Sequence, residues 1–164
     1  MISDLTVDEK IWSALNEVQD PEIPVLSLVD LGMISKIDAS DGSSVKVYMT
    51  PTFTGCPAIN IMKTMIVLKL LEHGFENASV IIDTENIWST EKMLDSAKLK
   101  LEKFGIAAPN KKSCMVEMSD LKDVPCPHCG SENTTLKSPF GSTLCRAMHY
   151  CNNCKQSFEQ FKPI

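Results

Sequence analysis

Two Cys-x-x-Cys pairs near the C-terminus constrain this chain more than any other feature. Cys126 and Cys129 form the first pair, Cys151 and Cys154 form the second, and 21 residues separate them. Two residues between thiolates let both sulfurs face one ion, and the intervening length allows a hairpin to carry the second pair back onto the first. The spacing predicts a four-cysteine zinc ribbon over residues 121–164, with all four cysteines as metal ligands.

The metal of such a ribbon is expected to be structural. A closed site of four thiolates leaves no coordination position for water or substrate, which favours zinc. The same geometry would bind a single iron, as in rubredoxin, and a redox-active Cys-x-x-Cys is a third alternative. The region has few large apolar side chains, so its folding is expected to depend on the metal. His128 lies inside the first pair, but four cysteines complete the ligand count, and we expect it to be exposed.

Composition points to a globular protein of the cytoplasm. Residues 1–4 have neither the basic nor the apolar segment of a secretory signal, and the apolar stretch 58–71 is too short to span a bilayer. Seven cysteines in a reducing compartment favour metal ligation or thiol chemistry over disulfides. The net charge of −5 divides into −6 for residues 1–122 and +1 for residues 123–164. This balance argues against non-specific binding of nucleic acid by the larger part.

The rest of the chain predicts an α/β (α+β) two-layer sandwich with a small mixed sheet. A capping box at Thr6 to Glu9 begins a helix, and Asp41-Gly42 is a turn signal between two β-compatible runs. The expected elements are helices over 7–19, 57–73 and 90–104 and strands over 33–39, 45–50 and 79–83, with a short strand over 114–118. The boundary is placed near residue 120, giving domains 1–120 and 121–164. The second helix is apolar on almost every side, so we expect deep burial, with an oligomer interface such as a homodimer as the alternative.

Cys56 is the candidate for thiol chemistry in the first domain. It directly precedes Pro57, which favours the first position of a helix, and a helix start stabilises an anion. A lowered thiol pKa is therefore expected, which would suit iron coordination or nucleophilic chemistry. A lone cysteine is also often just a small buried hydrophobic residue, and that reading stays open.

Several short motifs in the first domain occur together in one known family. They are Asp20-Pro21-Glu22-Ile23-Pro24, Asp30-Leu31-Gly32, Pro51-Thr52-Phe53-Thr54-Gly55-Cys56-Pro57-Ala58, Trp88 and Gly105-Ile106-Ala107-Ala108-Pro109. With these motifs, residues 5–110 resemble the iron–sulfur assembly factors that include SufT and the cytosolic targeting factors. The resemblance implies an α/β domain in which the Asp-Pro-Glu loop lies near the single cysteine and serves cluster delivery to client proteins. Its matching positions here are Asp20, Glu22, Thr54 and Cys56.

With the ribbon added, the whole chain resembles the PaaD (or PaaJ) family of accessory proteins encoded with the phenylacetyl-CoA epoxidase. The segment from Phe140 to Cys145 between the cysteine pairs strengthens this likeness. The resemblance implies a role in aerobic phenylacetate degradation, maturing the metal centres of the epoxidase. Its subunits, or their iron–sulfur reductase, would be the partners. The cargo would be iron or an iron–sulfur cluster bound transiently at Cys56. Cys145 is either a packed ribbon cysteine or a second delivery ligand.

An accessory protein is favoured over an enzyme. A di-iron oxygenase needs Glu-x-x-His motifs, and none of the three histidines follows a glutamate at that spacing. The chain also lacks a dinucleotide fingerprint and a haem attachment motif. The alternative function is a structural or electron-transfer subunit of the oxygenase complex. Nucleic-acid binding by the ribbon is the reading we favour least.

Overall fold

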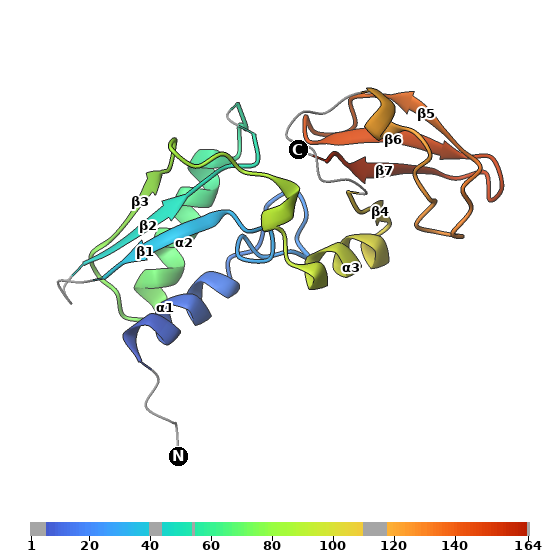
Figure 1. The fold of residues 1–164 in the computed structure, drawn as a ribbon. Coiled ribbons are helices and arrows are strands. Elements are labelled where there is room, and N and C mark those ends of the chain that lie inside the picture. Colours follow the sequence, from blue (N-terminus) through green and yellow to red (C-terminus); the bar gives the residue numbers. More distant parts are fainter. Residues whose placement is uncertain (1–5, 40–43, 54, 110–117, 164) are drawn as a thin grey trace, which may run out of the picture. The chain divides into compact units, whose positions relative to one another are not determined.

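The computed structural model describes residues 6–39, 44–53, 55–109 and 118–163 of the chain (Figure 1). Contacts divide it into two compact units. Unit 1 consists of Met1–Pro51 and Gly55–Ile87, and unit 2 of Thr52–Thr54 and Trp88–Ile164. Within the described part of the chain, no helix has both the length and the apolar character needed to cross a membrane.

Unit 1 begins with helix α1, Val7–Asn16. The predicted capping box is present, because the Glu9 amide donates to the Thr6 hydroxyl while the Glu9 carboxylate accepts from the Thr6 amide at 2.7 Å. The helix ends at Asn16, so the predicted end at residue 19 is wrong. Beyond it the chain is already extended, since the Leu28 amide donates to the Val18 carbonyl at 2.9 Å and Gln19 forms an antiparallel bridge with Ser27.

A three-stranded mixed sheet forms one layer of unit 1 (Figure 1). Strands β1, Ile34–Asp38, and β2, Val45–Met49, pair in antiparallel fashion, which confirms the predicted hairpin, although its turn lies outside the described residues. Strand β3, Ala78–Ile82, pairs in parallel with β2. The alternate residues Val45, Val47 and Met49 of β2 are buried, as in a strand that has one face on the core.

Helix α2, Ile59–Glu72, belongs to the second layer and contacts both β3 and α1. Its side chains Met62, Ile66 and Leu70 are fully buried. Ile61, Leu68 and Leu71 are exposed instead, so the expected burial of this helix on all sides is wrong. The reason is geometric: unit 1 places a sheet on one side of α2 only, and a single helix cannot bury its whole circumference against one layer. The predicted two-layer α/β sandwich itself is confirmed.

Unit 2 starts with a turn of 3₁₀ helix, Thr90–Lys92, and helix α3, Asp95–Phe104. The predicted helix start at Thr90 is wrong, because the backbone at Met93 and Leu94 is extended, with ψ of 132° and 146°. Two extended residues interrupt the helical hydrogen bonds, so the helix restarts at Asp95. The predicted end is confirmed, since Gly105 takes a left-handed conformation with φ of 91°.

The ribbon is built on a four-stranded sheet in the order β4-β7-β6-β5. Its strands are β4 Ile106–Ala107, β5 Thr134–Ser138, β6 Arg146–Cys151 and β7 Ser157–Phe161, preceded by the 3₁₀ helix η2, Met118–Leu121. Strands β5, β6 and β7 form antiparallel pairs, whereas β4 pairs in parallel with β7. The division into units groups residues 88–109 with the ribbon, whereas the sequence alone placed the boundary near residue 120. The predicted strand 114–118 lies outside the described residues except for Met118.

Trp88 is buried in unit 2, as predicted for a core aromatic residue. Its ring centroid lies 5.9 Å from that of Phe161, the last residue of β7, at an interplanar angle of 55°. A tilted pair at this separation is a favourable aromatic contact. It fixes the segment before α3 onto the ribbon sheet.

Candidate metal and thiol sites

The two Cys-x-x-Cys pairs sit in turns of the same geometry. In the first, the Gly130 amide donates to the Cys126 carbonyl at 2.8 Å, and in the second the Lys155 amide donates to the Cys151 carbonyl at 3.0 Å. Gly130 and Lys155 occupy equivalent positions and both have left-handed backbones, with φ of 70° and 63°. Each turn therefore directs two thiols toward one point.

The four sulfurs converge. Cys126 Sγ lies 3.7 Å from Cys154 Sγ, and Cys129 Sγ lies 3.6 Å from Cys151 Sγ. All four lie within 4.8 Å of one another. Zinc binds thiolates at about 2.3 Å, which places two sulfurs of a tetrahedral site about 3.8 Å apart. The donor set and its spacing therefore fit a four-coordinate metal.

Backbone amides prepare part of this site for a cation. Amide donors, led by that of Cys154, lower the pKa of the Cys151 thiol to about 6, and the Ser131 amide lowers the pKa of Cys129. The Gln156 amide acts in the same direction on Cys154, but burial and the neighbouring sulfurs together raise the pKa of that thiol to about 12. Crowded thiols cannot all ionise without a cation among them. Metal binding at this site should therefore release protons.

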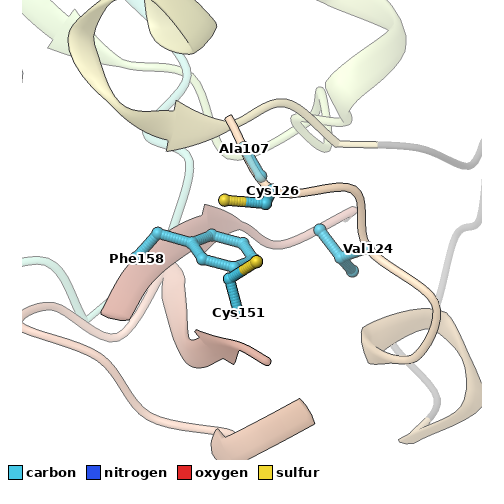
Figure 2. Packing of buried hydrophobic residues seen from close by; sticks show 5 residues of the cluster. All are labelled: Ala107, Val124, Cys126, Cys151 and Phe158. Carbon is cyan, nitrogen blue, oxygen red and sulfur yellow. The ribbon is translucent and has the colours of Figure 1, made fainter. Parts of the chain in front are cut away.

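Two of the four ligands also belong to the small apolar core of the ribbon (Figure 2). This cluster consists of Ala107, Val124, Cys126, Cys151 and Phe158, with Cys154 packed against it. In Figure 2 the Phe158 ring lies beside the Cys151 side chain. The metal site and the core are thus one structure, so loss of one should disrupt the other.

His128 is exposed and takes no part in the four-sulfur group. Its imidazole lies over the end of α3, where a Cβ added to Gly105 would lie 3.1 Å from Cε1. The histidine therefore covers a glycine in the connection to the ribbon.

Cys56 lies ahead of α2 but not at the position expected from Pro57. The helix begins at Ile59, after a turn in which the Ile59 amide approaches the Cys56 carbonyl at 3.4 Å. The predicted proline at the first helical position is therefore wrong by two residues. The thiol is half-buried, and the amides of Ala58 and Ile59 interact with it.

The pKa of Cys56 is raised, so the expected lowering is wrong. Burial is the largest cause, and the carboxylates of Glu22 and Asp20 add to it because they disfavour a second negative charge. The amides of Ala58 and Ile59 act in the opposite direction without offsetting these effects. The local sequence correctly indicated the amide donors near Cys56. It did not indicate the effect of the acidic loop, because that loop comes from a segment more than thirty residues away.

The effect of both carboxylates on the thiol pKa puts the acidic loop within electrostatic range of the cysteine. Asp20 also has a structural role, since its Oδ1 accepts from the amides of Glu22 and Ile23 at 2.8 and 2.7 Å and so shapes the loop. Thr54 lies outside the described residues. Among the described residues, only the four ribbon cysteines form a group with the mutual spacing of metal ligands, so Cys56, Asp20 and Glu22 do not constitute a closed site.

Cys145 is half-buried just before β6 and is separate from the four-sulfur group. Its Sγ lies 3.1 Å from the Thr143 hydroxyl. Lys162 lies nearby, donating to the Leu144 carbonyl at 2.8 Å; burial lowers the pKa of this lysine, while Cys145 acts to raise it. These contacts hold the cysteine in a packed loop. A role as delivery ligand stays a prediction.

Sequence reasoning missed a buried ion pair that supports the same loop. Arg146 donates to Glu159 at 2.8 Å, and both side chains are largely buried. Glu159 also accepts from the amide and hydroxyl of Ser142. The signal available was an arginine and a glutamate on neighbouring strands, two register positions apart, that sequence alone did not pair.

Comparisons with known proteins divide the chain in the same way as its motifs. Residues 8–73 match the model of the iron–sulfur cluster assembly protein family, and residues 110–162 match that of the PaaD zinc beta ribbon domain. A crystal structure of a domain of unknown function, DUF59, from Bacillus anthracis superposes with a TM-score of 0.51 at 26% identity. That comparison covers 56% of this chain and 88% of the other.

Relatives extend the match to almost the whole chain. An Fe-S protein maturation auxiliary factor of Porphyromonas gingivalis is 33% identical and covers 59% of this chain and 92% of its own. An Escherichia coli protein, provisionally named as one of the subunits of the 1,2-phenylacetyl-CoA epoxidase, is 37% identical over 94% of this chain and 92% of its own. The chain therefore belongs to the PaaD family, in which an iron–sulfur-assembly-type domain is followed by a zinc ribbon.

Proposed function

We propose that this protein is an accessory factor of the multicomponent phenylacetyl-CoA epoxidase in aerobic phenylacetate degradation. It delivers iron or an iron–sulfur cluster to the epoxidase or its iron–sulfur reductase through Cys56, and it does not catalyse epoxidation. The observation that carries the proposal is the half-buried Cys56 thiol within electrostatic range of Asp20 and Glu22. They lie within the segment that matches the iron–sulfur assembly family. The names of the relatives support both the pathway and the maturation role.

The raised pKa of Cys56 suits a carrier that holds its cargo briefly. At neutral pH the free thiol is protonated and weakly nucleophilic, so it resists oxidation and alkylation. A metal ion displaces the proton, because a coordinating thiol ionises. The carboxylates that disfavour a lone thiolate attract that cation. The acidic loop therefore favours the metal-bound thiolate over the free one.

A single thiolate also limits how tightly this site can hold an iron–sulfur cluster. Iron–sulfur clusters are usually held by four cysteines, so one cysteine leaves most of a cluster's coordination open. The remaining ligands have to come from the protein that receives the cargo. Incomplete coordination favours transfer over storage.

The ribbon serves this function by presenting a folded docking module to the epoxidase or its reductase. Cys126, Cys129, Cys151 and Cys154 would hold the zinc, which supplies a structural crosslink between the two turns. A closed four-thiolate site gives this metal no open position for cargo chemistry.

Replacement of Cys56 in cells that express the complete epoxidase system tests the proposal. Cys56→Ala should lower the iron content and specific activity of purified epoxidase or reductase several-fold, at unchanged amounts of every subunit. Cys145→Ala is the matched control: unchanged client iron assigns it a packing role, and an equal loss makes it a second ligand. Fully metallated, active epoxidase from the Cys56→Ala cells would overturn the proposal. In that case, loss of activity on deletion of the whole chain would favour a structural or electron-transfer subunit.

A further inference from the structure

Helix α2 exposes an apolar stripe that unit 1 does not cover. Ile61, Leu68 and Leu71 are 56%, 52% and 51% exposed, and the half-buried Met65 lies between them on the same side of the helix. These four residues form the α2 outward face. The solvent side of a surface helix is normally polar, and a contiguous exposed apolar patch marks an interaction site.

A hollow next to this face gives it a defined shape. Val18, Met65 and Leu68 line a cavity of about 180 Å³, together with Glu17, Lys69 and Glu72. Lys69 pairs with both carboxylates, at 3.4 Å from Glu17 and 2.6 Å from Glu72. His73 Nε2 also lies 3.2 Å from the Glu17 carboxylate, so the negative excess of this rim is one charge at most.

The charge of unit 1 indicates which partner the face can accept. Unit 1 contains thirteen Asp and Glu against five Lys, a net charge of −8, whereas the rest of the chain carries +3. Pairing this face with the same face of a second copy would bring two units of −8 together, and such like-charge contact opposes association. A basic partner gains attraction at the same surface, both in encounter rate and in specificity.

We propose that the α2 outward face is the docking surface for a helix of a partner protein whose apolar stripe is flanked by Lys and Arg. A Lys or Arg of that helix would place its apolar stem on Val18, Met65 and Leu68 and its charged head beside the carboxylates of Glu17 and Glu72, which Lys69 bridges. The inference goes beyond cargo delivery and holds even if Cys56 carries nothing. Because α2 begins three residues after Cys56, a helix bound near its start would lie close to the thiol.

A designed peptide tests the surface without knowledge of the natural partner. The probe is a 14-residue amphipathic helix of Leu and Lys, with a matched peptide in which Glu replaces every Lys. Titration of each into the ¹⁵N-labelled full chain, followed by NMR, should show saturable shifts on α2 for the basic peptide only. Leu68→Glu should weaken binding at least tenfold, and Glu17→Gln with Glu72→Gln should weaken it severalfold. Higher salt should also weaken it, because exposed charges are screened.

Matched controls separate docking from general stickiness and from unfolding. Val25 is 38% exposed in unit 1 but lies outside the face, so Val25→Glu should leave the affinity unchanged. Circular dichroism checks that Leu68→Glu remains folded, and Leu68→Ser is a milder second variant. Failure of the basic peptide to bind, equal binding by the acidic peptide, or undiminished binding to both Leu68 variants would overturn the proposal. Sedimentation that reveals a dimer dissolved by Leu68→Glu would also overturn it, because a second copy would then occupy the face.

Discussion

Removal of zinc is expected to unfold the ribbon while unit 1 stays folded. One apolar cluster of the ribbon contains five buried residues, and two of them, Cys126 and Cys151, are candidate metal ligands. Burial of Val124 and Phe158 contributes about 1.5–3 kcal/mol each, or about 3–6 kcal/mol together. Structural zinc contributes about 10–16 kcal/mol of apparent binding free energy in small modules. The metal therefore outweighs this cluster, and although Ile106, Ala147 and Phe161 are also buried on the sheet, its loss should unfold the two cysteine turns and the strands they join.

The two tryptophans allow each unit to be followed separately. Trp88 is buried in unit 2 against Phe161, whereas Trp12 is exposed on α1 of unit 1. In a Trp12→Phe variant the remaining emission comes from Trp88 alone. A strong zinc chelator should release one zinc per chain and shift this emission to longer wavelength as the indole enters water. In the Trp88→Phe companion, the emission of Trp12 should not change.

Metal release and unfolding have to be measured on the same sample. A colorimetric zinc indicator gives the stoichiometry, and ¹⁵N correlation spectra show whether ribbon amides lose their dispersion. Re-addition of zinc should restore both signals. If one equivalent of zinc leaves while Trp88 emission and ribbon dispersion stay unchanged, the metal does not hold this fold and the reasoning is refuted.

Four further predictions follow from the described contacts. Iodoacetamide should alkylate Cys56 slowly at pH 7 and much faster above pH 9, because burial and the Glu22 carboxylate raise the pKa of the thiol. For the same reason, Glu22→Gln should accelerate the reaction at pH 8. A maximal rate already at pH 7 would contradict this. Glu159→Gln should destabilise unit 2 by about 3 kcal/mol in denaturant unfolding, since it removes the negative charge that faces the buried Arg146 guanidinium, and adding Arg146→Met should recover part of the loss. Burial alone would raise the Glu159 pKa, but hydrogen bonds from the Ser142 amide and Arg146 hold it below 4.5. The stability of the wild-type protein should therefore fall as the pH drops through that folded-state pKa. The stability of Glu159→Gln should depend less on pH in this range. Gly105→Ala should cost about 1 kcal/mol, because φ is 91° there, and an unchanged denaturation midpoint would argue against strain.

Sequence alone predicted the elements whose signals are local. The Thr6 and Glu9 capping box, the β1–β2 hairpin and the end of α3 at Gly105 all depend on residues a few positions apart. The ribbon cysteines were predicted as a group for a similar reason: each Cys-x-x-Cys turn needs only its own few residues to direct two sulfurs to one side. Each of these patterns is explained by interactions within the short segment that contains it.

Tertiary structure decided the features that depend on distant neighbours. The pKa of Cys56 rises because folding buries the thiol and brings Glu22 and Asp20 within electrostatic range, and these effects outweigh the nearby amides that sequence revealed. Helix α2 looks uniformly apolar along the chain, and only the one-sided sheet determines that Met62 and Ile66 are buried and Leu68 is exposed. Sequence thus identified the groups available for chemistry. The fold decided their charge state and the surface they present, because burial and long-range electrostatics belong to no single segment.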